Sequence, residues 1–237
     1  MTNSLSQQAP LWQRLRARLW QQWRHWRFRL LQKQRYAALS LENVRGFDLV
    51  VLPEVYNPGL FETGALLVDA LTTVELGPSS YVLDMGTGTG LGAIAAAQIS
   101  QHITAADINP HAVRCAKINA LLNQVDDRMT ILESDLFAGL DDTRYDLVLF
   151  NPPFFRGTPA DWLDHAWRSN DVIERFAQAL PHHLTNTGCA LVVLSSNADE
   201  PVFLSAFRES GLNMSIVQQH DHINEIITIY KLESADQ

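Results

Sequence analysis

The sequence has little cysteine and no long apolar run. Its 237 residues include only Cys115 and Cys189, and neither lies in a CxxC pattern or a Cys/His cluster. We therefore expect no disulfide framework and no metal site, and reduced thiols suggest a cytoplasmic protein. No run of roughly 18 apolar residues occurs, so we expect no membrane-spanning helix. With 46% hydrophobic side chains, the length fits one large α/β domain with a short appendage.

Acidic residues are missing from one end of the chain. Residues 1–35 contain eight basic side chains and no acid, whereas the remaining 202 residues contain ten basic and 26 acidic side chains. The net charge of −8 therefore describes an acidic domain with a basic arm. Residues 1–10 are polar and without period, so we expect them to be disordered. Residues 36–237 are expected to form the main domain.

The basic arm, residues 11–35, has a helical period over positions 11–31. Apolar side chains spaced by three and four positions mark one face, namely Trp12, Leu15, Leu19, Trp23, Trp26 and Leu30. An amphipathic helix with so many tryptophans needs a surface to cover it. The alternatives are self-association or packing on its own domain, peripheral binding to an anionic membrane, an organellar transit peptide, and recruitment of RNA.

Short apolar segments alternate with helical segments from residue 81 onward. Strands are expected at 81–85, 102–106, 129–133, 145–150, 189–195, 214–219 and 225–231, and helices at 89–99, 110–123, about 168–184 and about 199–209. Asn109 can cap the second helix, where Pro110 fits the first helical position. The alternation predicts an α/β fold with a seven-stranded, mostly parallel sheet and helices on both faces. The last two strands are close together and should form an antiparallel hairpin at the sheet edge.

A glycine-rich turn, residues 84–90, follows the first of these strands and reads Asp-Met-Gly-Thr-Gly-Thr-Gly. Glycines let a ligand approach bare main chain. The spacing GxGxG, rather than GxGxxG, disfavours a dinucleotide. Asp84, just ahead of the first glycine, would repel a pyrophosphate but could bind an ammonium group. A turn that serves only the fold is the alternative.

Two further acids end the next two strands. Asp107 lies 21 residues after Gly86, where an acid commonly binds the ribose hydroxyls of an adenosine ligand. A helix-capping acid is the alternative. Asp135 follows the third strand, where its carboxylate could accept from an adenine amino group while Leu136 packs on the ring. Here the alternative is an ordinary loop acid.

The fourth strand runs directly into Asn151-Pro152-Pro153-Phe154, which we call the acceptor loop. Its prolines restrict the backbone and offer no N–H donors. The loop therefore presents acceptors, which are the Asn151 side-chain oxygen and the Pro152 carbonyl. One acceptor for each hydrogen matches a planar NH2 group, on which Phe154 could stack. A rigid structural turn is the alternative.

Together these four motifs resemble the Rossmann-like class I methyltransferases that use S-adenosylmethionine, in the branch with an NPP[YF] loop. That branch includes release-factor glutamine methyltransferases and related "methyltransferase small" proteins, as well as adenine-N6 and guanine-N2 methyltransferases of nucleic acids. The resemblance covers about residues 55–232, including the segments VYNP at 55–58 and ETGALL at 62–67. It implies a cofactor site formed by Thr63, Asp84, Gly86, Thr87, Gly88, Gly90, Asp107, Ile108, Asp135, Leu136 and Asn151, with Thr63 at the methionine end and the acceptor loop as the catalytic element.

The resemblance implies methyl transfer to a planar NH2 group. A protein glutamine, for example in a release factor, is favoured because an acidic domain binds phosphate backbones poorly. The alternative substrate is an exocyclic amine of a nucleobase in RNA or DNA. A non-catalytic nucleotide-binding module with a docking helix is the alternative from another class. Downstream of the loop, residues 161–167 could line a substrate pocket with Trp167 as a stacking wall, or Trp167 could simply pack.

Overall fold

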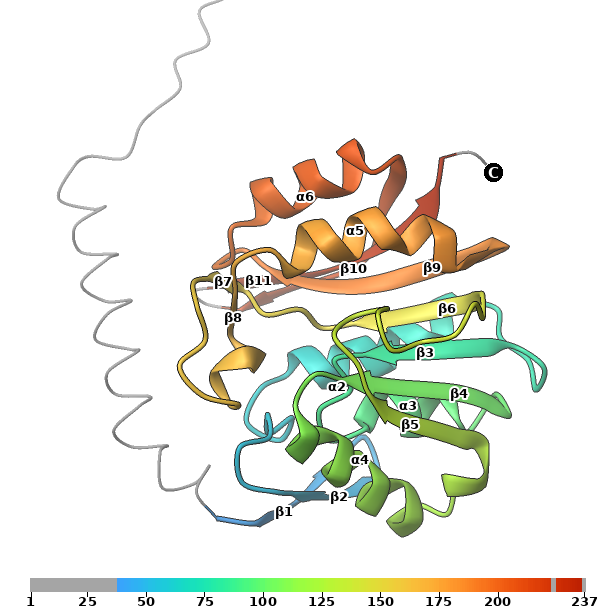
Figure 1. Cartoon of the computed structure of the whole chain (residues 1–237), viewed down its shortest axis with the longest axis vertical. Helices are drawn as coiled ribbons and strands as arrows, with labels where there is room; N and C mark the ends of the chain where they lie inside the picture. Colours follow the sequence, from blue (N-terminus) through green and yellow to red (C-terminus); the bar gives the residue numbers. More distant parts are fainter. Residues whose placement is uncertain (1–37, 223–224, 236–237) are drawn as a thin grey trace, which may run out of the picture. The chain divides into compact units, whose positions relative to one another are not determined.

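A seven-stranded sheet forms the centre of the computed structural model, which describes residues 38–222 and 225–235 (Figure 1). The predictions for residues 1–35 lie outside the described residues. The strand order is β10-β11-β9-β6-β3-β4-β5. The strands are β3 Tyr81–Met85, β4 His102–Asp107, β5 Met129–Glu133, β6 Tyr145–Phe150, β9 Leu184–Ser195, β10 Leu212–His222 and β11 Glu225–Ser234.

Strands β5, β4, β3, β6 and β9 pair in parallel, and β11 is antiparallel to both β9 and β10. The prediction of a mostly parallel sheet with a C-terminal antiparallel hairpin at its edge is therefore confirmed. Several strand boundaries differ from the sequence prediction. Strand β9 begins at residue 184 rather than 189, β10 spans residues 212–222 rather than 214–219, and β11 ends at residue 234 rather than 231. Polar residues at these ends pair as strand because a neighbouring strand continues beside them.

Helices cover both faces of this sheet, as expected. Helices α2 (Thr63–Asp69), α3 (Leu91–Ala96) and α4 (Pro110–Leu122) lie on one face, and α5 (Val172–His183) and α6 (Glu200–Glu209) lie on the other (Figure 1). Alternate residues of a strand point to opposite faces. In β6, accordingly, Leu147 and Leu149 pack in the core under α2 and α3, while Val148 and Phe150 pack under α5 and α6.

The helix starts show where local signals were sufficient. Asn109 caps α4, since its side-chain oxygen accepts from the backbone N–H of His111 at 2.9 Å. Helix α5, in contrast, begins at Val172 instead of about 168. Residues Arg168–Ser169 form the short strand β8, which pairs with β7 (Phe155–Arg156). Helical periodicity cannot predict such a pairing between two short strands that are joined by a loop.

A two-stranded hairpin, β1 (Ser40–Val44) and β2 (Phe47–Val51), was not predicted. Asn119 of α4, which is completely buried, attaches it to the domain. The Asn119 side chain accepts from Val50 N and donates to Val50 O, both at 2.8 Å. It also donates to Thr89 O at 2.9 Å. One buried amide thus joins the hairpin to the turn that precedes α3.

The sheet order places a ligand crevice at one position. The chain leaves β3 toward β4 on one side, and it leaves β6 toward β9 on the other. In open α/β sheets, ligands bind at the carboxyl ends of the strands where the order reverses. Here this point lies between β3 and β6, and the glycine-rich turn and the acceptor loop follow directly. Within the described part of the chain, no helix is long and apolar enough to cross a membrane.

Candidate active site

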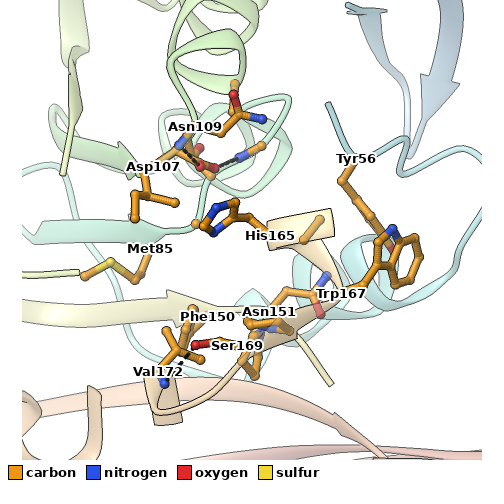
Figure 2. Close-up of a pocket in the computed structure, with 18 of the residues that line it drawn as sticks. Tyr56, Met85, Asp107, Asn109, Phe150, Asn151, His165, Trp167, Ser169 and Val172 are labelled. Carbon is orange, nitrogen blue, oxygen red and sulfur yellow. Dashed lines mark hydrogen bonds between the residues drawn. The ribbon is translucent and has the colours of Figure 1, made fainter. Parts of the chain in front are cut away.

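A cavity of about 390 Å³ lies at the carboxyl ends of β3, β4, β5 and β6 (Figure 2). This volume is within the range of roughly 300–1,000 Å³ that is usual for small-molecule sites. The cavity brings together residues from all four motifs, although they lie up to 70 positions apart. The residues predicted for the site that line it are Asp84, Gly86, Thr87, Gly88, Asp107, Ile108, Asp135, Leu136, Asn151, Pro152, Pro153 and Phe154. Thr63 and Gly90 do not line it.

The glycine-rich turn presents bare backbone to this cavity. Gly86 and Gly88 have φ values of 64° and 56°, in the left-handed region that favours glycine. A Cβ on Gly88 would meet nothing closer than 4.0 Å, so the chain here faces open space. Gly90 has a different role. A Cβ there would lie 3.2 Å from Ala116, so Gly90 allows α3 and α4 to pack closely.

Asp84 is buried and holds the turn from inside. Its Oδ2 accepts from the Thr87 hydroxyl at 2.6 Å and from the Ala93 N–H at 2.9 Å. Burial raises the pKa of Asp84 to about 6. No described residue donates to the Oδ1 atom. The carboxylate therefore fixes the turn to the first residues of α3, while it still lines the cavity expected to hold an ammonium group.

Asp107 joins the glycine-rich turn to the start of α4. Its two oxygens accept from Gly88 N at 2.8 Å and from Asn109 N at 2.9 Å. Desolvation raises the pKa of this carboxyl, although both backbone bonds favour its charged form. The side chain thus has a fixed orientation at the cavity wall, next to Ile108.

The turn after β5 has a strained backbone. Leu136 has a φ of 52°, which is uncommon for a residue with a Cβ. The Ser134 hydroxyl stabilises it by donating to Leu136 O at 2.6 Å and by accepting from Gly139 N at 2.8 Å. Leu136 thereby lines the cavity. The neighbouring Asp135 carboxylate is paired with Arg175 at 2.7 Å, a partner that the sequence did not suggest.

The acceptor loop ends β6 with its acceptors available. Asn151 Nδ2 donates to Thr63 Oγ1 at 3.1 Å, and the Tyr56 hydroxyl lies 3.1 Å from that same oxygen. Among the described residues, nothing donates to Asn151 Oδ1 or to the Pro152 carbonyl. The loop thus places beside the cavity two acceptors to which no described residue donates, and their role as acceptors for an NH2 group stays a prediction.

Residues 155–169, which run from β7 to β8, contribute further side chains to the cavity. His165 reaches from this loop toward Asp107 and lines the cavity (Figure 2). Trp167 also lines the cavity, and its ring packs against Tyr56 and Phe61 with centroids 5.2 and 4.8 Å apart. Trp167 therefore packs against neighbouring rings, and its role as a stacking wall for a substrate stays a prediction. The sequence analysis placed residues 161–167 at a pocket but gave His165 no role of its own, because its loop has no recurring pattern.

The described residues contain no group of three His, Cys, Asp or Glu side chains placed to hold a metal ion. The cavity instead combines bare backbone, fixed carboxylates and apolar side chains such as Met85 and Phe150. Residues 46–221 match the family of the methyltransferase small domain. The chain belongs to this family. It is an S-adenosylmethionine-dependent methyltransferase, so the alternative of a non-catalytic module is set aside.

Relatives of this methyltransferase are known from several organisms. A protein of Methanocaldococcus jannaschii, which its name assigns as a protein N5-glutamine methyltransferase, is 32% identical over 73% of this chain and 88% of its own. A release factor glutamine methyltransferase of Geobacter sulfurreducens is 29% identical over 73% of this chain and 64% of its own. A tRNA1(Val) adenine-N6 methyltransferase of Vibrio campbellii is 33% identical over 58% of this chain and 60% of its own.

Solved structures agree with the fold. The 16S rRNA guanine-N2 methyltransferase of T. thermophilus, solved with AdoMet and guanosine, superimposes with a TM-score of 0.66 at 20% identity. The match covers 83% of this chain and 50% of that one. The E. cuniculi complex that methylates the translation termination factor eRF1 gives 0.59 at 24% identity, covering 76% of this chain and 99% of that one. These likenesses confirm the class I methyltransferase fold.

Proposed function

We propose that this methyltransferase transfers a methyl group to the side-chain amide nitrogen of a glutamine in a protein substrate. The observation that carries the proposal is the acceptor loop beside the cavity, whose Asn151 Oδ1 and Pro152 carbonyl receive no hydrogen bond from any described residue. A primary amide has two N–H groups, and the loop offers one acceptor for each. The relatives named as glutamine methyltransferases support the same substrate class.

The residues that line the cavity fit the cofactor. Gly86 and Gly88 leave room for its amino-acid end against bare backbone, and Asp107 is the carboxylate suited to a ribose diol. Leu136 and Ile108 supply apolar surface for an adenine ring. His165 reaches into the same cavity toward Asp107, where it would cover the bound cofactor. When bound, S-adenosylmethionine supplies a methyl group activated by its positively charged sulfur.

The chain's own contribution to the reaction is alignment. Asn151 and Pro152 would each accept one N–H of the amide, which fixes the plane of the NH2 group and the direction of its nitrogen lone pair. Alignment of this kind lowers barriers by up to ~7–11 kcal/mol in favourable cases. The nitrogen gains one carbon substituent and loses one proton to solvent. The described residues show no general base at the loop, and a cationic nitrogen needs none to lose its proton.

Charge beside the cavity favours a protein over a nucleic acid. Three arginines lie in the 155–169 loop and in α5, and each is paired with a carboxylate: Arg156 with Glu174, Arg168 with Asp164, and Arg175 with Asp135. Affinity for a phosphate backbone comes mainly from basic side chains that can neutralise it. Paired arginines in an acidic domain offer little for such binding.

A nucleobase amine is the second candidate, because flat aromatic faces stand beside the loop. Phe154 and Trp167 line the cavity, and aromatic side chains commonly stack on splayed-out bases. The Vibrio campbellii relative, named as a tRNA adenine-N6 methyltransferase, keeps this candidate open. The basic arm at residues 1–35 would then be the element that recruits RNA.

Methylation of defined substrates tests the proposal. Purified full-length protein is incubated with methyl-labelled S-adenosylmethionine and either a recombinant bacterial release factor or total tRNA, and mass spectrometry locates the label. We expect methylated glutamine in the protein sample. Asn151→Ala should abolish most of this turnover while the Kd for the cofactor stays within a few-fold. The reason is that the hydrogen bond from the substrate amide to Asn151 matters chiefly while the nitrogen attacks the methyl group. Label found only in tRNA would overturn the substrate assignment.

We further propose a cytoplasmic location, which the state of the two thiols supports. Cys115 and Cys189 are free and buried, and burial raises the pKa of each thiol to about 11. These unreactive thiols support a reducing compartment such as the cytoplasm.

A further inference from the structure

Building on the proposed function, we infer that Thr63 and Tyr56 are positioning residues that hold the Asn151 amide with its oxygen toward the methyl acceptor. Three polar groups are joined by two contacts that begin at the acceptor loop, and the last of them, Tyr56, also lines the cavity. Asn151 Nδ2 donates to Thr63 Oγ1 at 3.1 Å, and the Tyr56 hydroxyl lies 3.1 Å from the same oxygen. Thr63 does not line the cavity, so its hydroxyl acts through Asn151 and not on the substrate.

The orientation of this amide decides whether the loop can work. A carboxamide presents an acceptor on one side and two donors on the other. With Oδ1 toward the substrate, Asn151 accepts an N–H from the acceptor amide. Rotated by half a turn, it would point its own N–H groups at that N–H, and the bond would be replaced by repulsion. An isolated asparagine has little preference between these two states, so a second contact must select one.

Thr63 alone does not select a state, because a hydroxyl can both donate and accept. The Tyr56 hydroxyl, 3.1 Å from Thr63 Oγ1, supplies an oxygen that can accept the Thr63 proton. We assign the direction of the bonds as Asn151 N–H to Thr63 oxygen and Thr63 O–H to Tyr56 oxygen. The Thr63 proton is then occupied, and only a lone pair remains for Asn151. Since a lone pair can bind only a donor, this assignment turns Nδ2 toward Thr63 and Oδ1 toward the cavity.

The surroundings hold both positioning residues in place. Thr63 is buried and is the first residue of α2, so the helix fixes its backbone. The Tyr56 ring stacks on Phe61, with centroids 5.2 Å apart, and meets the edge of Trp167 at 5.2 Å. Trp167 belongs to the 155–169 loop beside the cavity (Figure 2). Both supports of Tyr56 thus come from segments next to the acceptor loop.

Three substitutions in the full-length chain test the inference. Thr63→Val keeps the shape of the side chain but removes the hydroxyl, Thr63→Ser restores it, and Tyr56→Phe removes only the terminal oxygen. With saturating S-adenosylmethionine and a release factor as probe, kcat should fall about 10- to 100-fold in Thr63→Val. It should fall several-fold in Tyr56→Phe and return to within about threefold of the natural protein in Thr63→Ser. The Kd for S-adenosylmethionine should change by less than about threefold in all three.

The side-chain amide of Asn151 provides a readout that needs no substrate. Its ¹H–¹⁵N pair, identified by its loss in Asn151→Asp, should shift in Thr63→Val and Tyr56→Phe and return in Thr63→Ser. The controls are Thr72→Val and Tyr81→Phe, which alter a threonine and a tyrosine that do not line the cavity and should leave the pair unchanged.

Two results would overturn the inference. One is an Asn151 amide pair that stays in place in Thr63→Val. The other is a Thr63→Val protein with raised Kd for S-adenosylmethionine and unchanged kcat, which would make Thr63 a cofactor contact. If the natural protein does not methylate the release factor, the proposed substrate fails, and the amide spectra still decide the role of Thr63.

Discussion

Asp107→Ala tests the cofactor site at the residue where two motifs meet. The carboxylate accepts from Gly88 N at 2.8 Å and from Asn109 N at 2.9 Å, and the residue lines the cavity proposed for the ribose. Hydrogen bonds to a charged group contribute about 1.5–3 kcal/mol. Loss of one such contact with the ribose should therefore raise the Kd for S-adenosylmethionine roughly 10- to 150-fold.

The same change should affect stability much less. Removing the carboxylate leaves the Gly88 and Asn109 N–H groups without their acceptor, but water can reach them through the cavity. Removal also relieves the desolvation that raises the pKa of Asp107. These opposing effects should leave the free energy of unfolding within about 1–2 kcal/mol of the natural protein.

Isothermal titration calorimetry measures the affinity, and urea unfolding measures the stability. Asp146→Ala is the matched control, because Asp146 also accepts two bonds, from Tyr81 N at 2.8 Å and from the Thr185 hydroxyl at 2.9 Å, but does not line the cavity. The control should lose stability and keep its affinity. A folded Asp107→Ala protein with unchanged affinity would refute the reasoning.

Other substitutions test the turn, and a deletion tests the arm. Burial raises the pKa of Asp84 to about 6, so the folded protein holds more protons than the unfolded chain between pH about 4 and 6. The free energy of unfolding should fall by roughly 3 kcal/mol as pH rises through this window. Asp84→Asn should remove most of that slope in urea titrations, leaving the part due to Asp107; a slope equal to that of the natural protein would contradict the assignment. Gly90→Ala and Gly46→Ala share a left-handed φ, 86° and 87°, but only the first brings a Cβ 3.2 Å from Ala116. The free energy of unfolding should fall by about 1–2 kcal/mol in both variants, and by about 1–3 kcal/mol more in Gly90→Ala. Equal losses in the two variants would show that α3 and α4 can move apart at little cost. Full-length protein should sediment with anionic liposomes at low salt if residues 11–31 bind membranes, and deletion of residues 1–35 should abolish this. Protein that stays in the supernatant with and without the arm would exclude that proposal.

The sequence by itself determined the order of strands and helices in the main domain. Strands β3, β5 and β6 have the predicted bounds, because each is a short apolar segment between polar turns. The start of α4 was readable because Asn109 and Pro110 are local signals that act within one helical turn. The motif positions were readable for the same reason, since parallel strands bring their carboxyl ends to one edge of the sheet.

Only the tertiary structure decided which partners those residues take. The pairing of Asp135 with Arg175, the attachment of the β1–β2 hairpin by Asn119 and the approach of His165 to Asp107 all join residues at least 40 positions apart. The bond from Asn151 to Thr63 spans 88 positions. Such contacts depend on how the chain packs, and no local propensity or periodicity encodes them. The sequence therefore indicated candidate groups for the chemistry, and packing fixed the direction in which each group points.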